Sequence, residues 1–110
     1  MKKNEFEAGS KFSYEESIAY VDKGVVSKSV IKTTAGNISL FAFDKGEGLS
    51  EHTAPFDAVA LIVDGRAEIL IDGKQNILNS GESIIMPARI PHALKAVEKF
   101  KMVLTMIKNE

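Results

Sequence analysis

The chain has 110 residues, of which 45% are hydrophobic and 26% charged, with 14 basic residues against 15 acidic ones, as expected for a single globular domain. The near balance of charge argues against a nucleic-acid partner, and the absence of cysteine excludes disulfides and thiolate chemistry. No apolar stretch approaches the roughly 20 residues that span a bilayer, so we expect a soluble cytoplasmic protein without a membrane partner.

Residues 1–24 differ from the strand-rich remainder of the chain. The segment Ser13-Tyr14-Glu15-Glu16 fits a capping box, so we expect either a short helical turn or an extended arm here. The chain shows no internal repeat and no linker rich in Pro, Gly or Ser. We therefore predict an N-terminal arm over residues 1–24 and one barrel domain over residues 25–110.

From residue 25 onward, short β-branched or aromatic runs alternate with turn signals, which is typical of a sandwich or barrel. The predicted strands are Val25–Thr33, Asn37–Phe43, Ser50–Thr53, Ala58–Val63, Ala67–Ile71, Gln75–Asn79, Ser83–Met86, His92–Ala96 and Lys101–Ile107. Two Asp-Gly pairs, Asp64-Gly65 and Asp72-Gly73, favour tight hairpin turns. The sequence thus predicts an all-β fold.

The predicted strand Ala58–Val63 is apolar at every position, so both of its faces require cover. Alternation places Ala58, Ala60 and Ile62 on one face and Val59, Leu61 and Val63 on the other. We expect the first set to face the interior. The outward set can be covered by the N-terminal arm or by the partner in a homodimer, and the sequence leaves both open.

Two motifs follow each other in the middle of the chain. Gly46, His52 and Gly65 match the pattern G-x5-H-x-H-x3-E-x6-G, and Gly81, Pro87 and His92 match G-x5-P-x-G-x2-H-x3-N. With these motifs the chain resembles the cupin superfamily over roughly residues 25–107. The resemblance implies a jelly-roll barrel, the double-stranded β-helix, as in small single-domain cupins.

The sequence departs from the cupin motifs at four positions, which are Ala54, Ala58, Arg89 and Ala96. In the family, positions 54 and 58 carry a histidine and a glutamate that complete the set of metal ligands. The resemblance therefore implies that only His52 and His92 remain as ligands of a divalent metal such as Zn, Ni, Fe or Mn. We expect binding to be weak and the site incomplete, since catalytic zinc sites use at least three protein ligands.

Carboxylates near the vacant positions are Glu47, Glu51 and Asp57. Glu51 has the wrong strand parity to share a face with His52, and Asp57 suits a solvent-facing turn. Ligation by one of these three is the less favoured interpretation.

We also expect contacts to a small-molecule ligand beyond the histidines. Phe43 and Met102 lie on faces that are either plain core or pocket wall, because the two surfaces overlap in a barrel. Arg89 is either a solvated loop residue, strained if its φ angle is positive, or an anion clamp. With the two histidines, these residues form the predicted ligand site.

Three functions are compatible with this pattern. The first is a small-molecule-binding cupin with a degraded metal site, in which His52 and His92 contact the ligand. The second is a weakly metallated enzyme of the isomerase, dioxygenase or decarboxylase type, which holds metal through the two histidines and substrate oxygens. The third is a structural or interaction domain, because fold alone does not specify function.

Overall fold

The computed structural model describes residues 6–108 and contains one turn of 3-10 helix and eight strands. The elements are η1 (Glu15–Ser17), β1 (Val25–Thr33), β2 (Gly36–Phe43), β3 (Gly48–His52), β4 (Asp57–Ile71), β5 (Lys74–Asn79), β6 (Ser83–Met86), β7 (His92–Lys95) and β8 (Phe100–Ile107). The prediction of an all-β fold is confirmed. In the described residues no helix is long and apolar enough to cross a bilayer.

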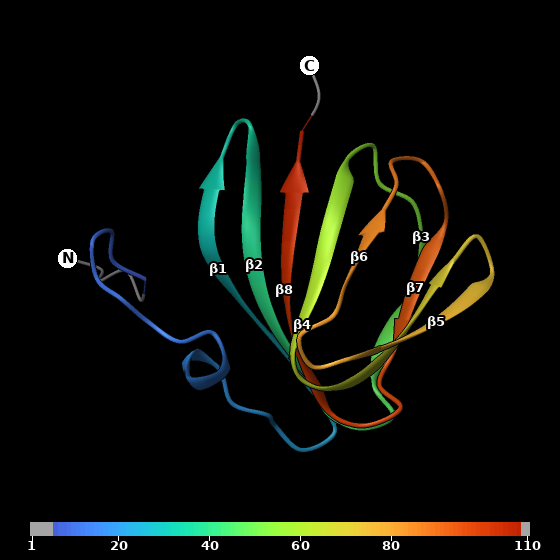
Figure 1. Cartoon of the computed structure of the whole chain (residues 1–110), viewed down its shortest axis with the longest axis horizontal. Coiled ribbons are helices and arrows are strands. Elements are labelled where there is room, and N and C mark those ends of the chain that lie inside the picture. Colours follow the sequence, from blue (N-terminus) through green and yellow to red (C-terminus); the bar gives the residue numbers. More distant parts are fainter. Residues whose placement is uncertain (1–5, 109–110) are drawn as a thin grey trace.

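The strands form two antiparallel layers that share β4. Its first half pairs with β8 and β6 in a layer that continues through β2 to β1, and its second half pairs with β5 and β7 in a layer that continues to β3. Figure 1 shows the two layers diverging upward from the bend of β4. This curled arrangement confirms the predicted jelly-roll barrel.

The bend of β4 corrects one predicted turn. We expected a hairpin at Asp64-Gly65, yet the strand runs through both residues, and Gly65 remains paired with Phe100 of β8. An irregularity between Ile62 and Asp64 turns the strand from one layer into the other. Gly65 adopts a φ of 81°, and a Cβ there would lie 1.8 Å from the carbonyl oxygen of Lys99.

The second Asp-Gly pair is a hairpin turn as predicted. Asp72 and Gly73 connect β4 to β5 with φ angles of 52° and 77°, the left-handed values that a two-residue hairpin loop requires. Nothing lies within 4 Å of a Cβ built on Gly73. The Asp-Gly dipeptide alone therefore does not distinguish a turn from a sheet corner. The first pair continues the strand because Gly65 is paired with Phe100 of β8.

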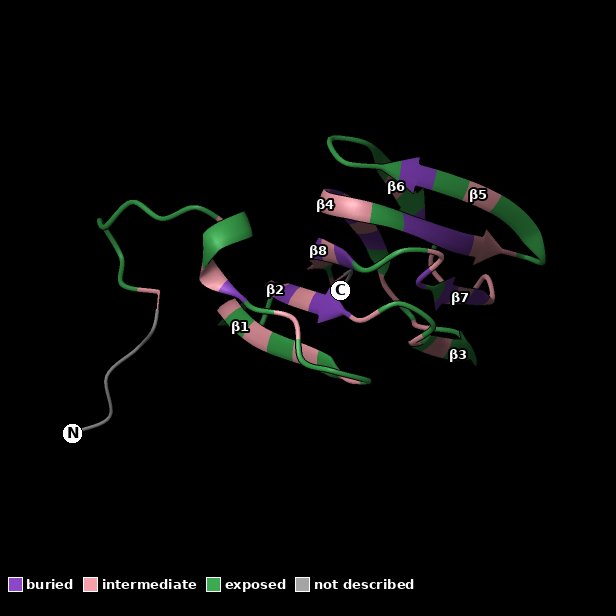
Figure 2. Ribbon diagram, turned by 90° about the horizontal axis from the view of Figure 1, so that it is seen from below, coloured by how far each residue is buried: buried purple, intermediate pink, exposed green. Residues whose placement is uncertain are grey.

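The closed end of the barrel, next to the bend of β4, is filled with apolar side chains. Phe43 and Phe100 stack with ring centroids 4.5 Å apart, and both are fully buried, as are Ile62 and Met102. In Figure 2 buried bands lie on β2, β4, β5, β7 and β8, whereas β1 alternates between exposed and intermediate residues. Burial of large side chains of this kind contributes about 1.5–3 kcal/mol each.

The N-terminal arm covers part of the outer face of the β1-β2-β8-β4 layer. Ile18 is buried there together with Leu40 and Val103, and Leu61 and Val63 of β4 pack against the same cluster. The expected helical turn is present as η1, where the Glu16 N–H donates to Ser13 Oγ at 3.4 Å, one of the two bonds of a capping box. The arm thus covers two of the three outward residues of β4, and the homodimer stays a prediction.

A hydrogen bond fastens the arm to the bend of β4. The Tyr20 hydroxyl donates to Asp64 Oδ2 at 2.5 Å. Burial, followed by this bond and the nearby carboxylates, raises the pKa of Tyr20 well above its ordinary value. The ammonium groups of Lys99 and Lys101 lie 4.7 and 5.1 Å from the centroid of its ring. The arm is therefore anchored by polar contacts as well as by apolar packing.

Candidate functional site

The open end of the barrel lies between the two halves of β4. Ala58 precedes the bend at Gly65 by seven residues and Ile71 follows it by six, so the two lie at similar distances from the closed end, on opposite layers. Across the sheets, Ala58 pairs with Met106 and Met86, and Ile71 pairs with His92. We call the space between these two rows the mouth of the barrel.

His52 and His92 meet at the mouth. They are direct cross-strand partners on β3 and β7, and their ring centroids are 4.4 Å apart with the planes at 68°. Because β3 and β7 are adjacent strands, both imidazoles come from the same wall of the barrel. The two rings meet there although forty positions separate them in the sequence.

An irregularity in β3 is what aims His52 inward. Leu49 pairs with Leu94 and His52 pairs with His92, so β3 uses one more residue than β7 over the same stretch. Leu49 packs against the core between the layers. Because of the extra residue, His52 lies on the same inner face as Leu49 although the two are three positions apart. Simple alternation would place them on opposite faces.

Each imidazole is held by one ring nitrogen. His52 Nδ1 lies 2.8 Å from the carbonyl oxygen of Ser50, and His92 Nδ1 lies 3.2 Å from that of Ile90. A carbonyl oxygen only accepts, so each Nδ1 carries the proton in the neutral ring. Each Nε2 is then left with a lone pair, which accepts a hydrogen bond or binds a metal.

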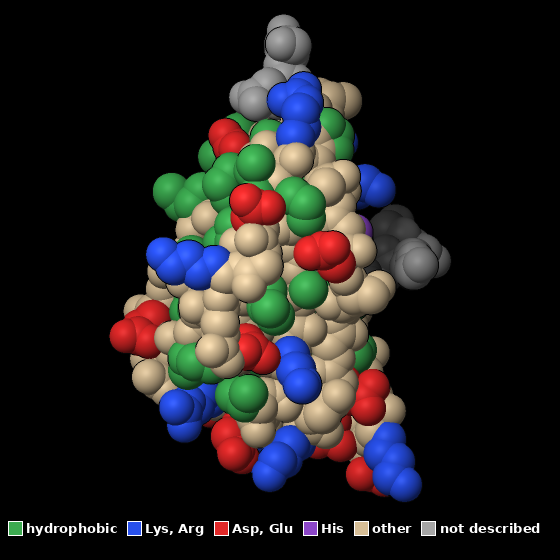
Figure 3. Space-filling model, turned by 90° about the vertical axis from the view of Figure 1, so that its right-hand side faces the viewer, with side chains coloured by type: hydrophobic (Ala, Val, Ile, Leu, Met, Phe, Trp, Pro, Cys, Tyr) green, Lys and Arg blue, Asp and Glu red, His purple; other side chains and the backbone are tan. Residues whose placement is uncertain are grey.

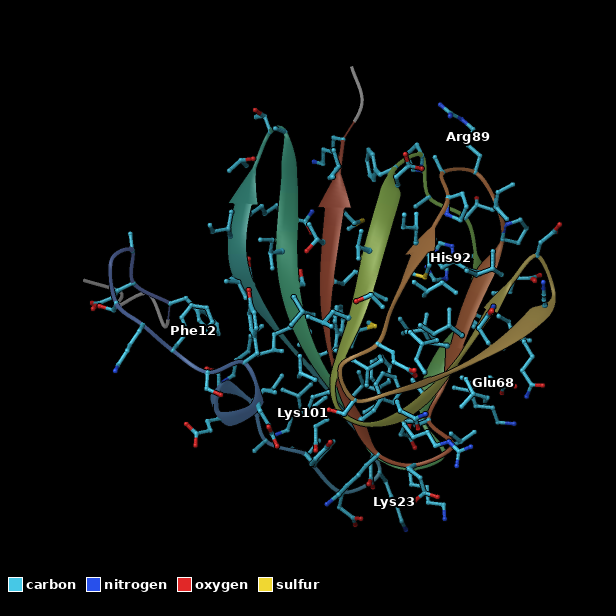
Figure 4. All side chains as sticks on the ribbon, in the orientation of Figure 1. Phe12, Lys23, Glu68, Arg89, His92 and Lys101 are labelled. Atoms are coloured by element: carbon cyan, nitrogen blue, oxygen red, sulfur yellow. The ribbon has the colours of Figure 1, made fainter. Side chains whose placement is uncertain are left out.

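The two histidines differ in exposure. His92 is 6% exposed, whereas His52 is exposed to solvent. Burial lowers the pKa of His92 below its ordinary value of 6.5, and the neighbouring His52 acts in the same direction, while the hydrogen bond to Ile90 opposes them. His92 is therefore neutral at pH 7. Figure 4 shows it between the two layers, and histidine surface is just visible at one edge of Figure 3.

The donor set of the mouth does not fit a resident metal. Ala58 lies on the inner face, and Ala54 lies in the connection between β3 and β4, so neither of these motif positions supplies a ligand. Asp57 is exposed and accepts the Ala88 N–H at 2.8 Å. Within residues 6–108, no three His, Cys, Asp or Glu side chains come together to hold a metal ion. Two imidazoles fall short of the three protein ligands of catalytic zinc sites.

The structure does not bring Phe43 and Met102 to the histidine pair. Both are fully buried, and they pair with Phe100 and Phe41 in the rows nearer the closed end. Met106, four residues further along β8 and on the same face, lies at the mouth instead, since it pairs with Ala58. Of the inward-facing residues of β8, Met106 lies at the mouth, whereas Met102 lies in the buried core.

Arg89 lies in the connection between β6 and β7, with its side chain exposed. Figure 4 shows its guanidinium pointing away from the barrel. Its φ of 65° is in the left-handed region, where the family has glycine, so the anticipated backbone strain is present. The Arg89 N–H donates to the Ala54 carbonyl at 2.7 Å. This bond ties together the two connections that border the mouth.

Three further residues at the mouth were not among the predicted site residues. Met86 and Ile71 line it through their pairing with Ala58 and His92, and Asn37 lies in the same row as Met106 on β2. Strand alternation places Asn37 on an inner face, but only the pairing of β2 with β8 puts it in the row of the mouth. No local motif marks it.

Comparison with known proteins agrees with this geometry. The sequence profile of the cupin domain matches residues 39–108, and the chain belongs to this family. Among curated proteins no match was found.

Solved structures share the fold over most of the chain. A conserved protein of unknown function from Streptococcus pyogenes is 34% identical, with a TM-score of 0.91 and coverage of 97% of this chain and 94% of that one. A cupin 2 conserved barrel domain protein from Leptotrichia buccalis is 38% identical, with a TM-score of 0.86. That match covers 88% of this chain and 47% of the other. A cupin superfamily protein from Desulfitobacterium hafniense is 25% identical, with a TM-score of 0.89 and coverage of 99% and 100%.

Proposed function

We propose that this cupin binds a small molecule at the mouth of its barrel, with His52 and His92 contacting the polar head of the ligand and no resident metal. The observation that carries the proposal is the pair of imidazoles, 4.4 Å apart, each with Nδ1 bonded to a backbone carbonyl. The two Nε2 atoms are the free polar atoms of this pair. They supply the chemistry of recognition.

The hydrogen bonds of the pair define the head group. Because each Nδ1 is bonded to a carbonyl oxygen, each ring in its neutral form offers an acceptor at Nε2. A hydroxyl, an ammonium or an amide N–H satisfies them, whereas a carboxylate places lone pairs against lone pairs. Apart from Asn37, the other residues that line the mouth are apolar, namely Ala58, Met86, Met106 and Ile71. The favoured ligand therefore has a hydrogen-bond donor attached to an apolar body.

The second candidate is a weakly metallated enzyme. The free Nε2 atoms favour it, because metal-bound histidines commonly bond their other nitrogen to a carbonyl or carboxylate. Such a site would have to be completed by water or by substrate oxygens. Metal analysis after dialysis separates the two candidates. We expect substoichiometric metal, and stoichiometric metal that resists a chelator would support the enzyme instead.

Phenol and toluene test the proposed recognition, since they share the apolar ring and differ in the donor. Phenol is titrated into the protein while the Nε2 resonances of both histidines are followed by NMR. We expect phenol to shift both resonances and to bind more tightly than toluene, because only phenol donates to Nε2. Equal affinities for the two probes, or shifts confined to other residues, would contradict the proposal.

A further inference from the structure

We propose that the ligand spans the mouth from the two histidines to Asn37, and that it carries a hydrogen-bond donor at each end of an apolar body. This inference rests on the proposed function. It adds a ligand contact at Asn37, on the layer opposite the histidines, and the chemical class of the ligand. Asn37 would be a specificity-determining residue on β2. It lies on the opposite layer from the histidines.

Asn37 carries a polar atom that has no partner. Its Oδ1 is buried and makes no hydrogen bond, the one such side-chain atom found among residues 6–108. Leaving a buried acceptor unpaired costs free energy, because the group has lost its hydrogen bond to water. A ligand donor that reaches this oxygen recovers that free energy. The neighbouring Met106 has a flexible side chain, which can move to admit the donor.

The sheet register puts Asn37 at the mouth. Asn37 pairs with Met106, and Met106 pairs with Ala58, so the three form one row across β2, β8 and β4. Ser39 and Phe41 follow Asn37 at two-residue steps on the same face, and Phe41 packs against the core between the layers. Strand alternation therefore directs Asn37 toward the space that the histidines face from the other layer.

The dimensions set the size of the ligand. Asn37 and Ala58 are two strands apart, about 10 Å, and stacked layers lie about 10 Å from each other. Met106 lies between the two ends of this span, and the neighbouring inner positions Leu104 and Phe41 remain partly exposed. These spacings correspond to an apolar body of roughly one aromatic ring with a short chain between a donor on Nε2 and a donor on Oδ1.

The acceptor atoms of the protein restrict the groups that the ligand can carry at its two ends. Asn37 Oδ1 and the two Nε2 atoms accept hydrogen bonds without carrying a formal charge. The ligand class is therefore an aryl or alkyl molecule with a hydroxyl, an amide N–H or an ammonium at both ends. Tyramine represents this class as a probe. Phenethylamine and 4-ethylphenol each lack one of its two donors.

Affinities for the three probes are measured by NMR titration on the wild type, Asn37→Leu and Asn79→Leu. The matched control residue Asn79 is exposed at the end of β5. We expect the wild type to bind tyramine about tenfold more tightly than the weaker of the two truncated probes, which corresponds to one buried hydrogen bond. In Asn37→Leu, the ligand donor that meets Asn37 in the wild type has no acceptor. The truncated probe that lacks this donor should therefore bind as tightly as tyramine, and Asn79→Leu should behave like the wild type.

The outcomes separate this inference from the proposed function. Two outcomes would contradict the inference while phenol binding still depends on the histidines, so that the proposed function stands. In the first, tyramine binds no more tightly than either truncated probe. In the second, tyramine binds more tightly than the truncated probes by the same factor in Asn37→Leu as in the wild type. If His52→Ala and His92→Ala leave the affinities of all probes unchanged, the proposed function fails. Absence of tyramine binding at millimolar concentration also overturns the inference, and circular dichroism of each variant verifies that it is folded.

Discussion

The closed end and the mouth of this barrel are built from the same strands but contain different chemistry. At the closed end, Phe43 and Phe100 stack in full burial beside the bend at Gly65. At the mouth, the inner positions of the same layers carry two histidines, an alanine and an asparagine with an unpaired oxygen. Packing therefore specifies the closed end, whereas the mouth retains polar groups that packing does not require.

The largest effect is expected at the closed end. Phe100→Ala removes a fully buried ring that stacks on Phe43, so we expect a loss of about 3–5 kcal/mol in the free energy of unfolding. Phe12→Ala is the matched control, because Phe12 is 45% exposed on the arm. Urea unfolding measures both. Similar losses in the two variants would mean that the closed end does not dominate stability.

The next effect concerns the bend of β4. Gly65→Ala places a methyl group against the carbonyl oxygen of Lys99 at a φ of 81°, so we expect a destabilisation of about 3 kcal/mol or a failure to fold. Gly73→Ala has a similar φ of 77° but open space around it, and should cost about 1–2 kcal/mol. Equal costs would show that backbone strain alone, and not the close approach, accounts for glycine at the bend.

Metal binding at the mouth should respond to restored ligands. The variant with Ala54→His and Ala58→Glu adds two donors beside His52 and His92, so we expect nickel affinity to rise at least about tenfold. In the control variant, Ala93→Glu replaces Ala58→Glu. Ala93 pairs with Leu70 and follows His92 directly, so its side chain lies on the other face of β7. Calorimetric titration showing no gain over the control would mean that position 58 does not face the histidines.

The smallest effect is a pH dependence of stability. Burial lowers the pKa of His92 in the folded state below the ordinary value of 6.5, so the unfolded chain takes up the proton first as the pH falls. Stability is therefore complete above about pH 6.5 and declines as the pH drops from there through the folded pKa. Urea unfolding of the wild type and His92→Asn at several pH values checks this. An unchanged slope in the variant would assign the effect to other groups.

Much of the fold follows from local patterns in the sequence. Alternation, strand propensity and two spaced motifs predicted the barrel and the position of most strands correctly. The role of Asp64-Gly65 could not be predicted, because a sheet corner and a hairpin demand the same backbone freedom. Which one forms depends on the pairing of Gly65 with Phe100, a contact distant in sequence.

The site was predictable only in part, for the same physical reason. His52 and His92 stand at motif positions, but their position on adjacent strands depends on the irregularity in β3. Phe43 and Met102 were predicted to touch the ligand from their inward parity, yet parity does not say how far along the barrel a residue lies. Asn37 becomes notable only through its unpaired oxygen and its row.

The central claim is that His52 and His92 act on one ligand at the mouth. Phenol affinity measured for the wild type, His52→Ala, His92→Ala and the double variant tests it most directly, because a shared ligand group couples the two residues. We expect each single substitution to weaken phenol binding, and the double variant to lose less affinity than the sum of the two single losses. Additive losses, or no loss in either single variant, would contradict it.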